Sequence, residues 1–139
     1  MIERMGSALR AGVVYFLAVF AAGFVLGVLR TLFVAPRIGV LAAVAVELPI
    51  VLAVGWWVSA RLQRGSSRTS RDAVLMGGTA FVLLMLAEVS LSIALFGRTF
   101  AEHLSLYVDA DHQLGLAGQI ACALIPMVQV RHRWREGSR

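Results

Sequence analysis

The sequence has no lysine, no asparagine, one cysteine and few charges of either sign. Charged residues make up 15% of its 139 residues, against roughly 25% in a soluble domain. This shortage excludes an ordinary soluble domain. The lone Cys122 excludes an intrachain disulfide and leaves the redox compartment open. Lysine and asparagine have AT-rich codons, so their absence is typical of a GC-rich, bacterial genome.

In place of charge, the chain has four long apolar runs separated by short polar segments. The runs cover residues 11–29, 38–60, 73–97 and 114–130. A helix needs about 20 apolar residues to cross the hydrocarbon core of a bilayer, which is roughly 30 Å thick. The sequence therefore predicts a single all-α membrane domain, residues 1–139, built as a bundle of four transmembrane helices.

The segments between the runs differ in character. Pro36 lies in the first connection, where we expect it to stop the helix and turn the chain. Residues 61–72 form a polar loop, and residues 131–139 form a basic tail. Four large side chains of segment 98–113 fall on one helical face: Phe100, Leu104, Tyr107 and Val108. Such a face predicts a short amphipathic helix on the membrane surface.

The arginines are distributed unevenly between the two sides of the predicted bundle. Ten belong to the two termini and the loop 61–72: Arg4, Arg10, Arg61, Arg64, Arg68, Arg71, Arg131, Arg133, Arg135 and Arg139. Three belong to the other side: Arg30, Arg37 and Arg98. Basic residues accumulate on the cytoplasmic side, so we expect cytoplasmic termini and an external segment 98–113. Membrane orientation thus accounts for the net charge of +5 without a nucleic-acid partner.

Two acidic residues lie inside apolar runs. Glu47 follows Arg37 by ten residues and Glu88 precedes Arg98 by ten, so each acid lies about 15 Å along a helix from an arginine. This places both near the middle of the membrane, where a charged side chain costs about 2.5–3.5 kcal/mol. Each acid must be paired, protonated or turned into the bundle. Their equal depth predicts that they face each other across a shared proton or a bound cation.

Helix periodicity gives the two acids candidate neighbours. Ser92 lies one turn after Glu88 on the same face, and Gln119 belongs to a small, polar stripe of the fourth run. With Glu47, these residues form the predicted intramembrane proton or cation site. The structural alternative is that the acids hydrogen-bond within the bundle or pair with an arginine. For Gln119 taken alone, the structural role is favoured.

Other residues of the runs and the tail have predicted structural roles. Pro49 and Pro126 each remove a backbone N–H from a predicted helix and so predict a kink. Gly23 and Gly27 form a GxxxG motif, which is typical of close helix packing. The tail alternates cations with an aromatic ring, and we expect it to bind anionic lipid headgroups. The tail residues concerned are Arg131, Arg133, Trp134 and Arg135.

The sequence contains no cofactor motif, and its potential metal ligands are confined to segment 98–113. These side chains are His103, Tyr107, Asp109, Asp111 and His112. Their spacing matches no established ligand motif, so we predict no metal site. An enzyme would need polar groups clustered near one membrane surface, and this segment alone offers them. A non-enzymatic protein is therefore favoured.

Four spans with a buried glutamate in a chain of this length resemble the small multidrug resistance transporters. In that family the essential acid lies in the first helix, whereas the first run here contains no acid. The likeness covers architecture alone, with no shared motif. It therefore implies no role for any particular residue.

The sequence leaves two functions open. The first is proton- or cation-linked transport through Glu47 and Glu88. Such a protein belongs in the bacterial inner membrane, as a homo-oligomer because four short helices enclose little room. The second is a non-catalytic accessory or assembly subunit, docked to a larger membrane complex by its acids and its GxxxG motif. The sequence identifies neither the transported ion nor the partner.

Overall fold

The computed structural model describes residues 1–64 and 68–137, with side chains as far as residue 135. Its four long helices are α1 (Ile2–Leu29), α3 (Val40–Gln63), α4 (Ser70–Phe96) and α6 (Ala110–Gly137). Shorter elements are the π-helical turn η1 (Arg30–Val34), α2 (Ala35–Ile38), α5 (Phe100–Ser105) and the 3-10 turn η2 (Leu106–Val108). The predicted all-α fold is confirmed. Each predicted run lies largely in one of four helices that are long and apolar enough to cross a membrane; Ile38, Gly39 and Gly97 fall outside the helix that holds the rest of their run.

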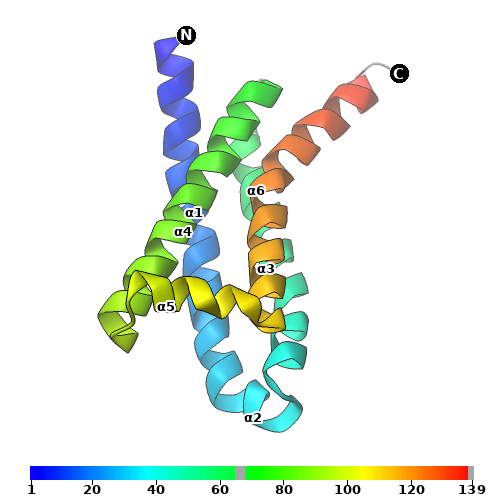
Figure 1. Cartoon of the computed structure of the whole chain (residues 1–139). Helices are drawn as coiled ribbons and strands as arrows, with labels where there is room; N and C mark the ends of the chain where they lie inside the picture. Colours follow the sequence, from blue (N-terminus) through cyan, green and yellow to red (C-terminus); the bar gives the residue numbers. More distant parts are fainter. Residues whose placement is uncertain (65–67, 138–139) are drawn as a thin grey trace.

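The long helices form a four-cornered bundle. α1 and α6 each pack against both α3 and α4. Within the described residues no close backbone contact joins α1 to α6 or α3 to α4, so these pairs are diagonal. Both chain termini lie at one end of the bundle, and α2 lies at the other (Figure 1). α5 runs across the long helices instead of along them (Figure 1).

The long helices extend beyond the apolar runs into polar sequence. α3 continues to Gln63 and α4 begins at Ser70, so much of the predicted loop 61–72 is helical. Residues 65–67 of that loop lie outside the described residues. Thr69 caps α4, because its hydroxyl accepts from the N–H of Asp72 while the Asp72 carboxylate accepts from the N–H of Thr69. This capping box satisfies N–H groups that lack a helical partner.

Pro36 does not stop the first helix, contrary to the expectation from the sequence. It lies at the start of α2, where the N–H that proline lacks would have no helical partner. The turns η1 and α2 therefore continue the helical path of α1 as far as Ile38. The chain reverses at Gly39, whose φ of 86° lies in the region that favours glycine.

Tyr15 lies in the core of the bundle and is fully buried. Its hydroxyl donates to the backbone oxygen of Cys122 at 2.8 Å. Pro126 lies four residues later in α6 and has no N–H to offer this carbonyl. Tyr15 thus satisfies the acceptor that Pro126 leaves open and joins the diagonal helices α1 and α6. Both α6 at Pro126 and α3 at Pro49 remain continuous helices, and α6 changes direction along its length (Figure 1).

Glycines permit close approach between helices. A Cβ on Gly77 of α4 would collide with the backbone oxygen of Ala123 in α6. A Cβ on Gly12 of α1 would lie 2.8 Å from the backbone oxygen of Met76 in α4, closer than real Cβ contacts. These two contacts fix how α4 sits between α1 and α6.

The described residues place no helix against Gly23 and Gly27, the predicted packing motif. A Cβ on Gly23 would meet no atom within 4 Å, and one on Gly27 would meet only the Arg30 side chain, at 4.0 Å. The motif lies in the part of α1 that leads to the turn, away from the tight contact at Gly12. Any close packing at this motif therefore involves another chain.

Candidate proton or cation site around Glu88

The two acids of the apolar runs have separate partners. Glu47 of α3 forms an ion pair with Arg30 of η1, with an N···O distance of 3.1 Å. Its side chain is 14% exposed. The reversal at Gly39 allows this pair, because it returns α3 alongside the turn that carries Arg30. The structure thus gives Glu47 the arginine that the structural alternative requires.

Glu88 of α4 is held by uncharged hydrogen-bond donors. The side-chain amide of Gln119 in α6 donates to one carboxylate oxygen, and the hydroxyl of Tyr107 in η2 donates to the other at 3.4 Å. The structure therefore brings together Glu88 and Gln119, which were both predicted for the site. It places Glu47 on the diagonal helix with a different partner.

Two residues associated with Glu88 have buried oxygens without a hydrogen-bond partner. Ser92, one turn along α4 from Glu88, is 5% exposed. Its Oγ and the Oε1 of Gln119 are buried and have no hydrogen-bond partner. A buried oxygen without a partner carries a desolvation cost of about 1–3 kcal/mol. The O–H of a protonated Glu88 could bond one of these oxygens, and a bound cation could take both as ligands, whereas the ionised carboxylate has no proton to offer.

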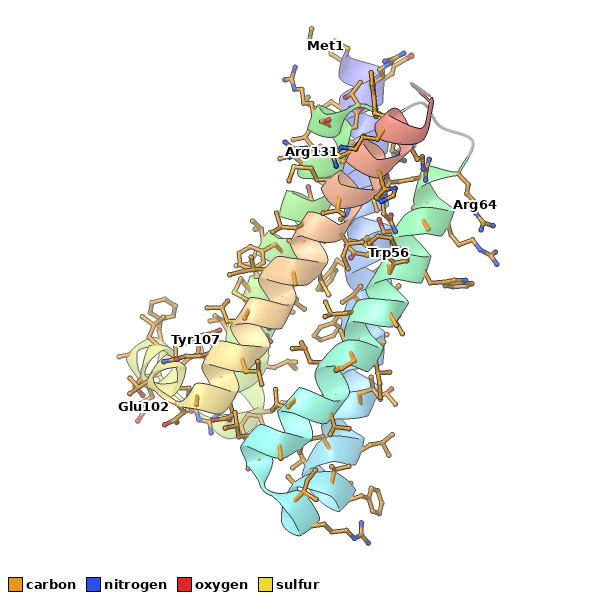
Figure 2. All side chains as sticks on the ribbon, turned by 90° about the vertical axis from the view of Figure 1, so that its right-hand side faces the viewer. Met1, Trp56, Arg64, Glu102, Tyr107 and Arg131 are labelled. Atoms are coloured by element: carbon orange, nitrogen blue, oxygen red, sulfur yellow. The ribbon has the colours of Figure 1, made fainter. Side chains whose placement is uncertain are left out.

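The position of Tyr107 differs from the amphipathic face predicted for segment 98–113. Phe100, Leu104 and Val108 are exposed. Tyr107 is half-buried and bonded to Glu88. Figure 2 shows Glu102 at the outer edge of this segment and Tyr107 closer to α6. The 3-10 turn η2 has about three residues per turn instead of 3.6, which rotates Tyr107 off the apolar face.

Gln113 holds Tyr107 in place. Its side-chain amide donates to the backbone oxygens of Tyr107 and Val108 at 3.0 and 3.3 Å, which ties η2 to the start of α6. Burial, and then the negative charge of Glu88, raise the pKa of Tyr107 above its ordinary value. The phenol therefore stays protonated near neutral pH and remains a donor to Glu88.

Two histidines flank the Tyr107 ring. His103 of α5 packs edge to face at 5.6 Å between ring centroids, and His112 of α6 does so at 6.3 Å. His103 is 6% exposed, and neither ring nitrogen has a hydrogen-bond partner. His112 Nδ1 lies 3.0 Å from a carboxylate oxygen of Asp111. The sequence pattern did not link these histidines to Glu88, although the four-residue spacing of His103 and Tyr107 already places them on neighbouring turns.

One group of side chains in segment 98–113 has the geometry to hold a metal ion. The ligand atoms of Asp109, Asp111 and His112 lie within 4.8 Å of one another. Asp109 is exposed, and Asp111 already pairs with His112. Such groups are common on protein surfaces without a metal, so we assign none.

A small apolar hollow lies between α1, α4 and α6. Its lining comes from Tyr15, Phe16, Val19, Ala80, Phe81, Leu84, Gln119, Cys122 and Ala123. Within this lining, Gln119 also bonds Glu88. Gln119 therefore contacts both the carboxylate and the hollow.

A second buried polar cluster joins α3 to α6 toward the end that carries the termini. Ser59 donates to the side-chain oxygen of Gln129 at 2.8 Å, and Gln63 donates to the same oxygen at 2.9 Å. Gln129 donates to the backbone oxygen of Trp56 at 2.9 Å. Most hydrogen bonds of this cluster join its own members, Ser59, Gln63 and Gln129. Such a network is typical of side chains that fix the register of two helices. This cluster was not predicted, although the four-residue spacing of Ser59 and Gln63 already places the two side chains on neighbouring turns of one helix.

The predicted lipid-binding residues lie at the end of α6. Arg131, Arg133, Trp134 and Arg135 are exposed. Trp134 is 68% exposed, and Arg133 also donates to the backbone oxygen of Gln63 at 3.1 Å. The side chains of residues 136–139 lie outside the described part of the tail.

Comparison of the chain with models of protein families, with curated proteins and with solved structures gave no match. The fold defines the class as an all-helical bundle whose four long helices suit a multi-pass membrane protein. Within this class, Glu88 and its partners from α4, η2 and α6 are the candidate site.

Proposed function

We propose that the protein carries out proton- or cation-linked transport and that Glu88 binds the ion. The observation that carries this proposal is the pair of buried oxygens, Ser92 Oγ and Gln119 Oε1, that lack partners beside an intramembrane carboxylate. Intramembrane carboxylates are the usual proton carriers and cation ligands of pumps and transporters. A site that binds and releases an ion needs hydrogen-bond partners for both its loaded and its empty state.

The two bonding states use the same side chains. When Glu88 is ionised, Gln119 and Tyr107 donate to it, as the structure has them. When Glu88 takes up a proton, its O–H needs an acceptor, which Ser92 Oγ or a rotated Gln119 amide supplies. A cation would take the same oxygens as ligands. Gln119 serves both states because its amide carries a donor and an acceptor.

We assign Glu47 a structural role. Its ion pair with Arg30 neutralises the carboxylate and ties the start of α3 to the turn after α1. Breaking a buried pair by removing one partner leaves an uncompensated charge. The proposal therefore narrows the two acids expected from the sequence to one ion-binding acid, Glu88.

The proposed setting is the bacterial inner membrane, with both termini in the cytoplasm. The end that carries the termini also carries most of the arginines, as the positive-inside rule requires. There the exposed Arg131, Trp134 and Arg135 are placed to contact anionic lipid headgroups. In this orientation α5, which carries His103, lies on the external side.

The unpacked GxxxG motif supports assembly with another chain. Among residues 1–64 and 68–137, no helix packs on Gly23 or Gly27, and a second copy of α1 could pack closely there. The same observation favours the second function, an accessory subunit of a larger complex. Gentle extraction distinguishes them: a homo-oligomer containing this chain alone supports the transporter, and a stoichiometric partner supports the accessory subunit.

Flux measurements in proteoliposomes test the transport proposal. Under an imposed gradient of protons, of Na⁺ or K⁺, or of an organic cation, wild-type protein should transport at least one of these ions. Glu88→Gln should abolish that flux, and Ser92→Ala should weaken it. The Glu47→Gln/Arg30→Gln variant removes both charges of the ion pair together and is the matched control, which should retain flux. Equal flux for wild type and Glu88→Gln would refute the proposal.

A further inference from the structure

We propose that protons reach Glu88 through His103 and Tyr107, beneath α5. This inference rests on the function proposed above and specifies its ion and its route of access. The residues come from three elements: His103 from α5, Tyr107 from η2 and Glu88 from α4. α5 packs against both α4 and η2.

The first step is the position of His103. It lies on the inner side of a six-residue helix whose outer side presents Phe100 and Leu104, which are 57% and 51% exposed. An imidazole can both accept and donate a proton near neutral pH. A purely packing role would suit an apolar ring at least as well, because burying polar nitrogens without partners costs free energy.

The second step is the link from His103 to the carboxylate. The His103 ring contacts Tyr107, whose hydroxyl donates to Glu88 at 3.4 Å. Gln113 fixes the backbone of Tyr107, so the phenol is held between the histidine and the acid. The other titratable groups near this path are His112, whose ring also packs edge to face on Tyr107, and Asp111, which is paired with His112.

The third step is the movement of the proton. A hydronium ion at the membrane surface transfers a proton to His103 and becomes a water molecule. The Tyr107 O–H proton passes to the Glu88 carboxylate, and the phenol oxygen receives a proton from the His103 imidazolium, directly or through one water. The result is a neutral imidazole, an intact phenol and a neutral carboxylic acid. One proton has entered, and one negative charge has been neutralised.

Once neutral, Glu88 no longer accepts a charge-assisted bond from Gln119. Its new O–H can donate to Ser92 Oγ or to the rotated Gln119 amide, the acceptors that lack partners in the structure. Gln119 also lines the small hollow between α1, α4 and α6. The residue that donates to the ionised acid is therefore also the one that joins the acid to this hollow.

Infrared spectroscopy after a rapid drop in pH measures proton uptake by Glu88 without a transport assay. Wild-type protein in nanodiscs should show a carboxylic acid band that Glu88→Gln removes. His103→Phe keeps a ring under α5 but removes its nitrogens, and it should slow the growth of this band by about tenfold or more. Tyr107→Phe should slow it likewise. His132→Ala changes an exposed histidine at the other end of the bundle and should leave the rate unchanged.

Chemical rescue separates proton transfer from packing. His103→Ala leaves a ring-sized space, and added imidazole should restore fast uptake, whereas thiazole, which fills the space but relays no proton well, should not. Hydrogen exchange of α5 amides shows whether the segment stays folded in each variant. Wild-type rates in His103→Phe, or rescue by thiazole equal to that by imidazole, would overturn this route. Absence of a Glu88 band in wild-type protein would instead refute the proposed proton chemistry at Glu88.

Discussion

At the scale of single residues, the hydrogen bond from Tyr15 to the Cys122 carbonyl depends on Pro126. Tyr15→Phe removes the donor and leaves a buried carbonyl without a partner, which should cost about 1–3 kcal/mol of unfolding free energy. In a Pro126→Ala background the alanine N–H can bond the same carbonyl, so Tyr15→Phe should cost less there. Denaturant unfolding in mild detergent measures both costs. Equal costs would show that Pro126 is not the reason for the Tyr15 bond.

Neighbouring glycines of α4 provide a matched pair for testing helix contact. A Cβ on Gly77 would collide with the backbone of Ala123, whereas Gly78 is exposed and has no neighbour within 4 Å. Gly77→Ala should destabilise the bundle by about 1–3 kcal/mol or more through overpacking. Gly78→Ala should be neutral or stabilising by up to roughly 1 kcal/mol, because alanine favours helix over glycine. Thermal unfolding of the two variants checks this, and similar values would contradict the tight contact.

At the scale of elements, the sequence predicted the four long helices because each needs an apolar run to cross lipid. It did not predict their polar ends, since apolarity marks only the part of a helix within the hydrocarbon. The capping box at Thr69 and the continuation through Pro36 are local hydrogen-bonding features that extend helices into polar sequence. Tyr107 was assigned to the wrong face because a period of 3.6 residues does not hold across the 3-10 turn η2.

The start of α5 should depend on pH. Thr99 and Glu102 form its capping box, and the backbone N–H of Thr99 is the main cause that lowers the pKa of Glu102 below its ordinary value. A carboxylate with a lowered folded-state pKa stabilises the cap above its unfolded pKa, and this stability is lost as the pH falls through the lower value. Hydrogen exchange of α5 amides, corrected for intrinsic rates, should therefore show fraying in acid.

Two variants control for this prediction. Glu102→Gln keeps an oxygen acceptor for the capping box but does not titrate, so its α5 should show little dependence on acid pH. Thr99→Ala should loosen α5 at every pH. If wild-type and Glu102→Gln proteins lose protection in parallel on acidification, another group is responsible.

At the scale of the whole molecule, the sequence located the polar residues along each helix but not their neighbours across the bundle. Glu47 and Glu88 have equal predicted depth, yet α3 and α4 occupy diagonal corners, and each acid bonds to a different element. Depth follows from counting residues along one helix. Which residues face each other across the bundle depends on the order of the helices around it. Close contacts such as that of Gly77 with Ala123 determine this order. Gln119 therefore became a partner of Glu88 only through the packing of α4 on α6.

The orientation of the whole bundle decides from which side Glu88 is protonated. In a Cys122→Ser background, Ser70→Cys and Ser105→Cys place conservative labels at exposed sites at the start of α4 and the end of α5. The arginine distribution predicts that a membrane-impermeant maleimide added to intact cells labels position 105 and leaves position 70 unlabelled until the membrane is opened. The reverse pattern would place α5 in the cytoplasm, and His103 would then take protons from inside. The same labels therefore determine the topology of the bundle and the side of the membrane from which protons reach Glu88.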